Sequence, residues 1–300
     1  MPARITACYP DKPAKESVLF EDSHYQVGRD HDCEVRLNHP SVSRKHAFVE
    51  SSGEHWFLKD GLSSNGVKVN GESVVDRELS TNDLISLGDI NCLFELQSQQ
   101  QLDATNAHNA WRIQQSRKSY NELAHQSLLD ALDEQLFSLL NLTGTQRGLV
   151  MLGNSPETLT VCAAKGMSRQ EFHHQSFEGS VGAMQLALQR KSPILAMDVR
   201  LEHQLASRES IQRKQIAALA CIPLLSDNNL VGVVYTDSKE ANKVLTELDL
   251  EILNLVSEQI KINSEAIVLQ NEISAILSHI PEHIFAQKQP IKEQIFAAVH

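Results

Sequence analysis

Three short polar blocks in the N-terminal third of this 300-residue sequence carry side chains suited to binding an anion. They are Gly28-Arg29, Ser43-Arg44-Lys45-His46 and Ser64-Asn65-Gly66. An arginine guanidinium presents a planar, permanently charged fork that matches two oxygens of an anion, and serine hydroxyls add short hydrogen bonds. A phosphate dianion has three strong acceptor oxygens and needs several convergent donors of this kind. The blocks therefore indicate a phosphate site, provided that the fold brings them together.

The segments between these blocks have the pattern of short β-strands. Apolar and polar residues alternate in runs such as Glu34–Leu37, Ala47–Val49 and Trp56–Leu58. Clusters of Gly, Asn, Asp and Ser separate such runs over residues 5–97, which is typical of an antiparallel sandwich. Residues 67–75 form the clearest hairpin, because Asn70-Gly71 is the strongest short turn signal. The polar blocks lie between strands and are therefore expected in loops.

Blocks and strands together resemble the forkhead-associated (FHA) family, whose members are β-sandwiches that bind phosphothreonine. The three blocks look like the family's signatures, in the same order and at similar spacing. The resemblance implies an FHA domain at residues 1–97, and Asn65 matches the residue whose amide pairs with the peptide main chain beside the phosphothreonine. Five residues are expected to contact the phosphopeptide: Arg29, Ser43, Arg44, Ser64 and Asn65.

Three more residues of the blocks are expected to support the site. Gly28 is expected to adopt a backbone conformation closed to residues with a Cβ. By the resemblance, His46 braces the recognition loop through a hydrogen bond and does not touch phosphate. Gly66, which ends the third block, is assigned to the same supporting role.

The third block departs from the usual family pattern. FHA domains typically show Asp-Leu-Gly-Ser-Thr-Asn-Gly-Thr, whereas this chain has Asp60-Gly61-Leu62-Ser63-Ser64-Asn65-Gly66-Val67. The exchanged Gly61-Leu62 is expected to bend the loop differently. Asn82-Asp83 replaces a frequent Gly-Asp turn, which is tolerable because Asn also accepts left-handed backbone angles. No departure removes a phosphate donor; the alternative is a sandwich that has lost binding and serves as a spacer.

Composition and charge narrow the function classes. The net charge is −11, with 41% hydrophobic and 22% charged residues, the balance of a soluble globular protein. Neither half has the broad basic field that nucleic-acid binding needs. No apolar run approaches the roughly 18 residues that span a bilayer, and the N-terminus lacks the apolar core of a signal peptide. We therefore expect a cytoplasmic protein that binds neither nucleic acid nor membrane.

Cysteine spacing and motif content argue against metal, cofactor and catalytic chemistry. The five scattered cysteines form no Cys-x-x-Cys pair, so neither a zinc ribbon nor a thioredoxin-like centre is indicated. The sequence has no P-loop, no Gly-x-Ser-x-Gly elbow and no His-Glu-x-x-His. We expect reduced thiols, no metal, no cofactor and no enzymatic activity.

The rest of the chain mixes helix and strand patterns. A polar linker at 97–101 precedes a helical pattern over 105–142, in which Leu129, Leu132, Leu136 and Leu139 form one apolar seam. Ser180 is expected to cap a helix that runs through Gln189. Thr246 with Asp249 three residues later resembles a capping box that opens a long helix. Core strands are expected at 149–152, 159–162, 220–224 and 230–235, the last two joined by the turn 227–229.

Residues 120–272 resemble a GAF domain, a small-molecule sensor fold with an antiparallel sheet and flanking helices. The segments that carry the resemblance are Ser180–Gly182, Ser192–Leu195 with Asp198, Ala220–Leu224, Val231–Asp237 and Leu245–Asp249. We therefore expect a multidomain chain: an all-β sandwich, a linker and the start of a signalling helix at 98–119, an α+β domain at 120–272 and a tail at 273–300.

The resemblance does not name a ligand for this second domain. Cyclic-nucleotide-binding members carry Asn-Lys, a Phe and later Asp-Glu, in which the lysine and aspartate form a salt bridge. Here Asn242-Lys243 precedes a leucine and Asp249-Leu250, so the motif is degenerate. His173-His174 is interpreted as a solvated loop, and Cys162 and Cys221 as core thiols. Haem, bilin and methionine-sulfoxide-reducing chemistry therefore have little support.

An apolar face on the last helix predicts a homodimer. Leu253, Val256, Ile260 and Ile267 follow a heptad-like seam, with Asn263 at a core position between them. A buried Asn at such a site can fix the register at some cost in stability. The alternative is that this face packs on the domain's own sheet.

These expectations combine into a non-catalytic signalling adaptor. Its first domain would dock a phosphothreonine-containing protein from a Ser/Thr kinase pathway, and its second would dimerise and bind a small molecule that the sequence does not identify. Dimeric display would raise avidity for a doubly phosphorylated target. Two alternatives stay open: a small-molecule-sensing regulator that the first domain only localises, and a redox enzyme that uses a cysteine of the second.

Overall fold

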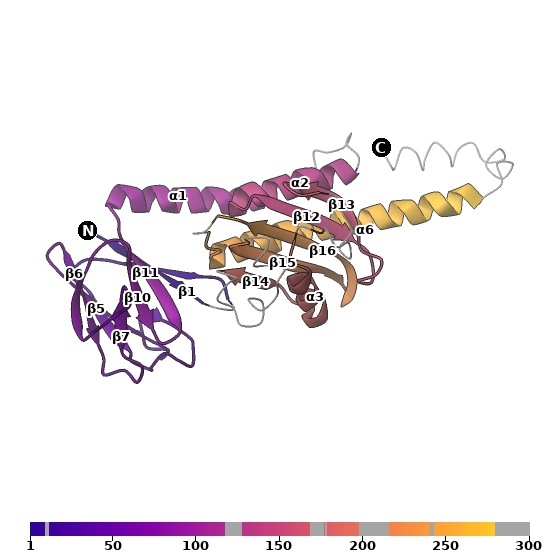
Figure 1. Cartoon of the computed structure of the whole chain (residues 1–300). Coiled ribbons are helices and arrows are strands. Elements are labelled where there is room, and N and C mark those ends of the chain that lie inside the picture. Colours follow the sequence, from indigo (N-terminus) through magenta and orange to yellow (C-terminus); the bar gives the residue numbers. More distant parts are fainter. Residues whose placement is uncertain are drawn as a thin grey trace. The chain divides into compact units, whose positions relative to one another are not determined.

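A computed structural model describes residues 1–9, 12–117, 128–168, 177, 179–197, 216–240 and 243–279. These residues form a sandwich of two β-sheets and a separate domain with one sheet and helices (Figure 1). The expected fold class, an all-β domain followed by an α+β domain, is confirmed. Among the described helices, none has both the length and the apolar character needed to cross a membrane.

The sandwich pairs a six-stranded sheet with a five-stranded sheet. Their strand orders are β2-β1-β11-β10-β7-β8 and β4-β3-β5-β6-β9. All neighbours are antiparallel except β3 and β4, which pair in parallel. The strands are β1 (Ala3–Cys8), β2 (Lys15–Leu19), β3 (His24–Gly28), β4 (Val35–Arg36), β5 (Ala47–Ser52), β6 (His55–Asp60), β7 (Val67–Val69), β8 (Glu72–Val74), β9 (Asp76–Leu79), β10 (Asp83–Leu87) and β11 (Ile90–Leu96).

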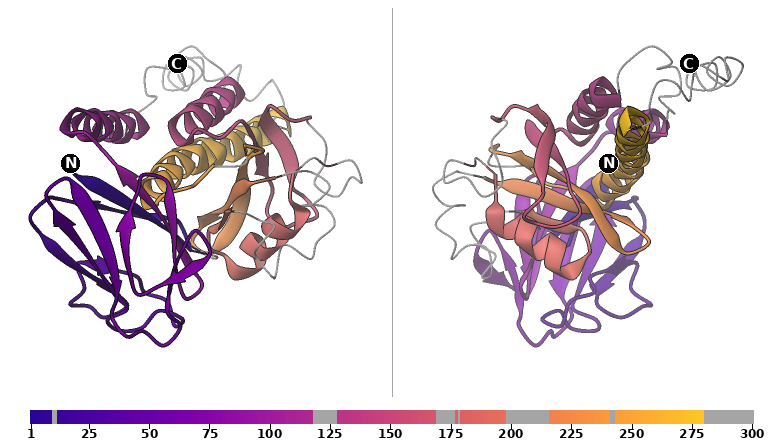
Figure 2. Two further views of the ribbon diagram at one scale, coloured as in Figure 1. Left: turned by 60° about the vertical axis from the view of Figure 1, so that its left-hand side comes forward. Right: turned by 90° about the vertical axis from the view of Figure 1, so that its right-hand side faces the viewer.

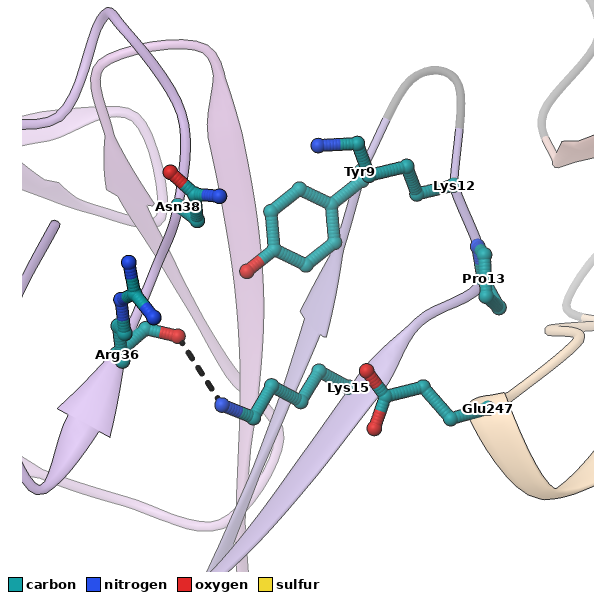
Figure 3. A pocket seen from close by; sticks show the side chains of 7 residues that line it. All are labelled: Tyr9, Lys12, Pro13, Lys15, Arg36, Asn38 and Glu247. Atoms are coloured by element: carbon teal, nitrogen blue, oxygen red, sulfur yellow. Dashed lines mark hydrogen bonds between the residues drawn. The ribbon is translucent and has the colours of Figure 1, made fainter. Parts of the chain in front are cut away.

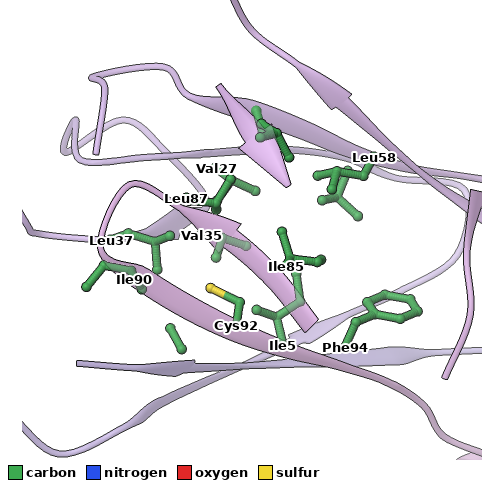
Figure 4. Packing of buried hydrophobic residues seen from close by; sticks show 14 of the residues in the cluster. Ile5, Val27, Val35, Leu37, Leu58, Ile85, Leu87, Ile90, Cys92 and Phe94 are labelled. Carbon is green, nitrogen blue, oxygen red and sulfur yellow. The ribbon is translucent and has the colours of Figure 1, made fainter. Parts of the chain in front are cut away.

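Alternating strand side chains fill the space between the two sheets (Figure 4). Trp56 and Phe94 are the largest, each at most 1% exposed, and their rings meet edge to face at 6.3 Å. Trp56 also donates its indole N–H to the carbonyl oxygen of Met1 at 2.9 Å. Burying one large apolar side chain contributes about 1.5–3 kcal/mol. This core fixes the strand ends from which the polar loops project.

Tight turns occur where the sequence indicated them. Asn70 and Gly71 both have positive φ, 52° and 85°, and they join β7 to β8 in the predicted hairpin. The positive φ of Asn82, 71°, confirms that asparagine takes the left-handed position expected there. In the second domain Asp227 and Asn228, with φ of 48° and 67°, connect two long core strands, as predicted.

The helices that follow the sandwich differ in part from the expectation. Helix α1 (Gln99–Ser116) begins inside the polar run that was expected to be a linker. Helix α2 (Leu128–Thr143) buries Leu132, Leu136 and Leu139, whereas Leu129 of the predicted seam is 50% exposed. Residues 118–127, which the helical prediction also covered, lie outside the described residues.

The second domain contains a five-stranded sheet in the order β13-β12-β16-β15-β14. Helix α2 packs on β12 and β13, and Figures 1 and 2 show α2 and α6 on one side of the sheet and α3 on the other. The elements are β12 (Arg147–Leu152), β13 (Thr160–Lys165), α3 (Val181–Arg190), β14 (Ile194–Met197), β15 (Ala218–Ser226), β16 (Asn229–Ser238) and α6 (Glu247–His279).

Both predicted helix caps of this domain are confirmed. Ser180 accepts a hydrogen bond from the backbone N–H of Ala183 at 3.2 Å and so caps α3. At the start of α6, Thr246 donates its backbone N–H to an Asp249 carboxylate oxygen at 2.8 Å, and Asp249 donates its own N–H to the Thr246 hydroxyl at 3.3 Å. This reciprocal pair is a capping box.

Candidate functional site

The first two polar blocks are held together by their backbones. Arg29 directly follows β3, and Ser43–His46 directly precedes β5. The Arg29 N–H donates to the carbonyl oxygen of Ser43 at 3.0 Å, and the Asp30 N–H donates to that of Arg44 at 3.1 Å. Side chains that are fifteen positions apart in the sequence therefore start from neighbouring backbone positions.

His46 connects the second block to the third. Its side chain is fully buried, and its Nδ1 accepts the backbone N–H of Ser43 at 2.9 Å. Its Nε2 lies 3.1 Å from the carbonyl oxygen of Gly66. Because Nδ1 accepts and a carbonyl cannot donate, Nε2 carries the proton and the ring is the neutral tautomer. The structure thus contains the bracing hydrogen bonds that the resemblance implied for this histidine.

Ser43 supplies a second connection between the same loops. Its hydroxyl oxygen accepts the backbone N–H of Ser64 at 3.1 Å. A hydroxyl that accepts this bond still has its own proton to donate. The Ser43 hydroxyl is therefore oriented by one loop while it keeps its donor for a ligand.

Gly28 is required for a reason other than the one expected. It is not among the residues with positive φ, so the expectation of a special backbone conformation is wrong. A Cβ built at Gly28 would lie 2.2 Å from the carbonyl oxygen of Arg44. Any side chain would therefore push the second block away from the first. Gly66 does have a left-handed φ of 69°, which favours glycine, and nothing lies within 4 Å of where its Cβ would be.

Ser41 supports the site and was missed by the sequence reasoning. Its carbonyl oxygen accepts a hydrogen bond from the side-chain amide of Asn65 at 2.8 Å. Its hydroxyl accepts the backbone N–H of Asp89 at 2.8 Å, which ties the second block's loop to the turn between β10 and β11. A lone serine outside the signature blocks carries no local signal of this role.

The donors of the three loops are accessible. Arg29, Arg44, Ser64 and Asn65 are exposed, and Ser43 is half-buried. Neither guanidinium is ion-paired to a carboxylate within the described part of the chain. Asn65 uses one N–H on Ser41 and retains a second N–H and its amide oxygen, which suits the pairing with a peptide main chain. The arrangement offers two local cations in a chain of net charge −11.

Asp30, the residue after Arg29, is held by its neighbour His31. One Asp30 carboxylate oxygen accepts both the backbone N–H and the ring Nδ1–H of His31, each at 2.7 Å. These hydrogen bonds from His31 lower the pKa of Asp30. Asp32 lies 3.1 Å from the other ring nitrogen, so the three side chains could approach one cation. His31 and Asp32 are largely exposed, and no further feature of the described residues marks a metal site.

A small polar cavity lies away from these loops, and the residues that line it belong to one compact unit of the chain. Its volume is about 320 Å³, and Figure 3 shows the Lys15 ammonium donating to the carbonyl oxygen of Arg36 at 3.3 Å. Burial raises the pKa of Tyr9, whose ring forms part of the wall. The lining residues are Tyr9, Lys12, Pro13, Lys15, Arg36, Asn38 and Glu247. None of the five predicted phosphopeptide contacts belongs to it.

Lys243 and Asp249, which match the lysine and aspartate of the cyclic-nucleotide motif, do not form a salt bridge with each other. Asp249 forms an ion pair with Arg112 of α1, and both side chains are largely buried. Lys243 interacts with Asp249 only at longer range, and burial lowers its pKa. The lysine–aspartate salt bridge implied by the family motif is therefore replaced by an arginine–aspartate pair. Asn242, Asp198 and His173-His174 lie outside the described residues.

The two cysteines of the second domain are far apart. Cys162 lies on β13 and Cys221 on β15, and strands β12 and β16 separate them in the sheet. Three strand spacings of about 4.8 Å put them about 14 Å apart, whereas a disulfide needs Cα atoms within about 7 Å. Cys221 is fully buried, and burial strongly raises the pKa of its thiol. These two thiols do not form a reactive pair in this fold.

Comparison with known proteins assigns both parts of the chain. Residues 25–88 match the FHA domain model, and residues 127–263 match the GAF domain model. No curated protein matches the chain.

Solved FHA structures are similar to its N-terminal third. The FHA domain of CT664 from Chlamydia trachomatis is 25% identical, over 33% of this chain and 100% of that one, with a TM-score of 0.31. Slr1951 from Synechocystis sp. is 25% identical, over 32% and 99% of the two chains, with a TM-score of 0.29. Mycobacterium tuberculosis EmbR, in complex with a low-affinity phosphopeptide, is 27% identical over 31% of this chain and 25% of that one, with a TM-score of 0.27.

The signature blocks, the sandwich that joins them and the two model matches lead to one assignment. The chain carries an FHA domain followed by a GAF domain.

Proposed function

We propose that the chain is a non-catalytic signalling adaptor that binds phosphothreonine-containing proteins through its FHA domain. The observation that carries the proposal is the convergence of three donor-bearing loops, joined by the two hydrogen bonds of buried His46. Preorganised donors bind an anion without a further ordering cost. The partner would be a substrate of a Ser/Thr kinase, and the setting would be the cytoplasm, with neither nucleic acid nor membrane as a ligand.

Each of the five contact residues has a distinct task in this proposal. Arg29 and Arg44 provide charge for the phosphate, and Ser43 adds an oriented hydroxyl. Ser64 lies beside Ser43 and supplies a further hydroxyl. Asn65 pairs with the peptide main chain next to the phosphothreonine. An extended peptide held by its backbone leaves its flanking side chains to set specificity.

The experiment that tests this function is capture from a degenerate phosphothreonine peptide library by the full chain. Matched phosphoserine and unphosphorylated libraries measure the dependence on the modification. Arg29→Ala should abolish selective capture, while Arg77→Ala, an exposed arginine of β9 outside the three blocks, should not. If the Arg29 variant still captured phosphothreonine peptides selectively, the assignment of this site to phosphothreonine binding would be refuted. An absence of capture by the folded wild-type chain would favour the spacer alternative.

We also propose that the chain is a homodimer, through a different face of α6 from the one predicted. Leu253, Val256 and Ile260 are at most 1% exposed within the chain itself, so these residues of the predicted seam are buried within one chain and do not face a partner. A second stripe with 4-3-4-3 spacing is exposed instead. It consists of Ile262, Ala266, Leu269, Ile273 and Ile276. This spacing is the heptad period of a two-stranded coiled coil.

Flanking charges favour a parallel pairing of this stripe. In a parallel pair, Glu265 would face Gln270 of the second copy and Glu272 would face Leu277, so no like charges meet. An antiparallel pair would place the glutamates of the two copies opposite each other. Leu269→Glu should therefore convert a sedimenting dimer to monomer, whereas Val268→Glu, also exposed but off the stripe, should not. A wild-type chain that sediments as a monomer at micromolar concentration would contradict the proposal.

The first alternative, a small-molecule sensor that the FHA domain only localises, rests on the GAF match. A ligand that binds only the folded state raises the melting temperature. Screening the full chain against nucleotides and metabolites by thermal shift therefore separates the two functions. A hit together with absent phosphopeptide capture would favour the sensor.

A further inference from the structure

Leu62 is an outlier in the third loop of the FHA domain. Its side chain is 95% exposed, and its backbone has a left-handed φ of 58°. Leucine avoids that conformation because its Cβ approaches the following carbonyl oxygen. Nearly full exposure also means that the side chain gains nothing from burial in the isolated chain. Residues with strained backbone conformations of this kind are concentrated at functional sites.

The surrounding loop explains why Leu62 takes this conformation. Gly61 donates its N–H to the carbonyl oxygen of His46 at 2.8 Å, and a Cβ at Gly61 would lie 3.0 Å from that same oxygen. Ser63 donates its N–H to an Asp60 carboxylate oxygen at 3.1 Å. Both neighbours are thus fixed, and Leu62 is held between them at the turn. The usual family order has glycine at this position, where the left-handed angle costs nothing.

A second exposed apolar residue adjoins the same loop. Val75 is 76% exposed, and its carbonyl oxygen accepts the Asp60 N–H at 2.8 Å. Leu62 lies two residues from Ser64 and three from Asn65 along the chain. A chain spans at most about 3.6 Å per residue, so the Leu62 Cα lies within about 7 Å of the Ser64 Cα. Leu62 therefore lies near the groups assigned to phosphate and peptide, and Val75 contacts Asp60 at the start of the same loop.

We propose that Leu62, together with Val75, which contacts the start of the same loop, selects an apolar side chain of the phosphopeptide. The inference rests on the proposed phosphothreonine-reading function and adds the target class. Asn65 fixes the peptide main chain, and an extended peptide rises about 3.3 Å per residue. A side chain within about three positions of the phosphothreonine can therefore reach Leu62. The preferred targets are proteins with a phosphothreonine and an aliphatic or aromatic residue at one such position.

The test is an oriented peptide library with phosphothreonine fixed and the three positions on each side varied, presented to the full chain. The wild type should enrich apolar residues at one position. Leu62→Gly removes the side chain and suits the left-handed angle, so the variant should fold; it should lose the apolar preference, keep its dependence on phosphorylation and bind the selected peptide about tenfold more weakly. Val75→Thr should weaken the preference in part. Leu84→Ser, an exposed leucine on β10, should leave it unchanged.

The possible results distinguish a failure of the Leu62 proposal from a failure of the proposed phosphothreonine binding. Phosphothreonine capture with the same apolar preference in wild type and Leu62→Gly would overturn the role of Leu62. Phosphothreonine capture by the wild type without any apolar preference would overturn it too, and both results leave the reader function standing. An absence of phosphorylation-dependent capture in every variant would refute the reader function and this inference together.

Discussion

His46→Ala would test whether the phosphate site depends on the connection between its loops. The substitution leaves the Ser43 N–H without its acceptor and the Gly66 carbonyl oxygen without its donor. An unsatisfied buried polar group costs about 1–3 kcal/mol. Because Ser43 and Gly66 are only half-buried, we take about 1.5 kcal/mol for each, or about 3 kcal/mol in all. In a domain of about 100 residues, this lowers Tm by about 12–24 °C.

Two conservative variants divide this effect between the two hydrogen bonds. Asparagine can place an amide oxygen near the position of Nδ1 and accept from Ser43, while glutamine can place an amide nitrogen near that of Nε2 and donate to Gly66. Each should recover about half of the lost free energy of unfolding. The assay is thermal and urea unfolding of the full chain in a Trp111→Phe background, so that the fluorescence reports Trp56 of the FHA domain alone.

Phosphopeptide binding by the same variants tests whether the connection between the loops also matters for the ligand. His46→Ala should weaken phosphopeptide binding at least tenfold at a temperature where the variant is folded, because Ser43 and Ser64 are no longer held together. Arg29→Ala, by contrast, should lose binding with little change in Tm, since Arg29 is exposed. If His46→Ala melts within about 3 °C of the wild type, the two hydrogen bonds do not carry the assigned free energy and the reasoning fails.

Three other outcomes are expected. Phosphopeptide affinity should fall as the pH drops below about 6, where the free phosphate dianion takes up one proton and becomes a monoanion; a flat titration calorimetry profile from pH 7.5 to 5 would contradict binding of the dianion. Native alkylation at pH 8 should spare Cys92 and Cys221, because burial raises the pKa of both thiols and keeps them protonated; rapid labelling of either, read by mass spectrometry, would reopen the redox alternative. Asp249→Asn should lower the free energy of unfolding by about 3 kcal/mol, since it removes the carboxylate charge from a largely buried ion pair with Arg112, and urea unfolding that matches the wild type would show that the pair is dispensable.

Local signals predicted much of the fold. The Asn70-Gly71 and Asp227-Asn228 turns, the Ser180 cap and the Thr246–Asp249 capping box each depend on residues within three or four positions. Their physics is local hydrogen bonding and backbone preference, so one sequence suffices to find them. The strands of the sandwich follow from alternation in the same way.

Helix faces were predicted less well, because periodicity shows that a face is apolar and does not show what covers it. The seam of Leu253, Val256 and Ile260 was assigned to a partner and is instead buried within the chain. Leu129 fits the seam of α2 by spacing yet is half exposed. The exposed heptad stripe that begins at Ile262 lies on the same helix, and only the packing of the first half of α6 separates the two faces.

The sequence by itself determined which residues can bind a phosphate and that they lie in loops between strands. Only the tertiary structure decided how these loops are joined, through hydrogen bonds of His46 and of the Ser43 hydroxyl. It also decided that the carbonyl group of Arg44 lies so close to Gly28 that no Cβ fits there. It also decided that Leu62 is strained and exposed beside them. The physical reason is that convergence of distant segments depends on long-range packing and backbone pairing, which no local pattern of residues encodes.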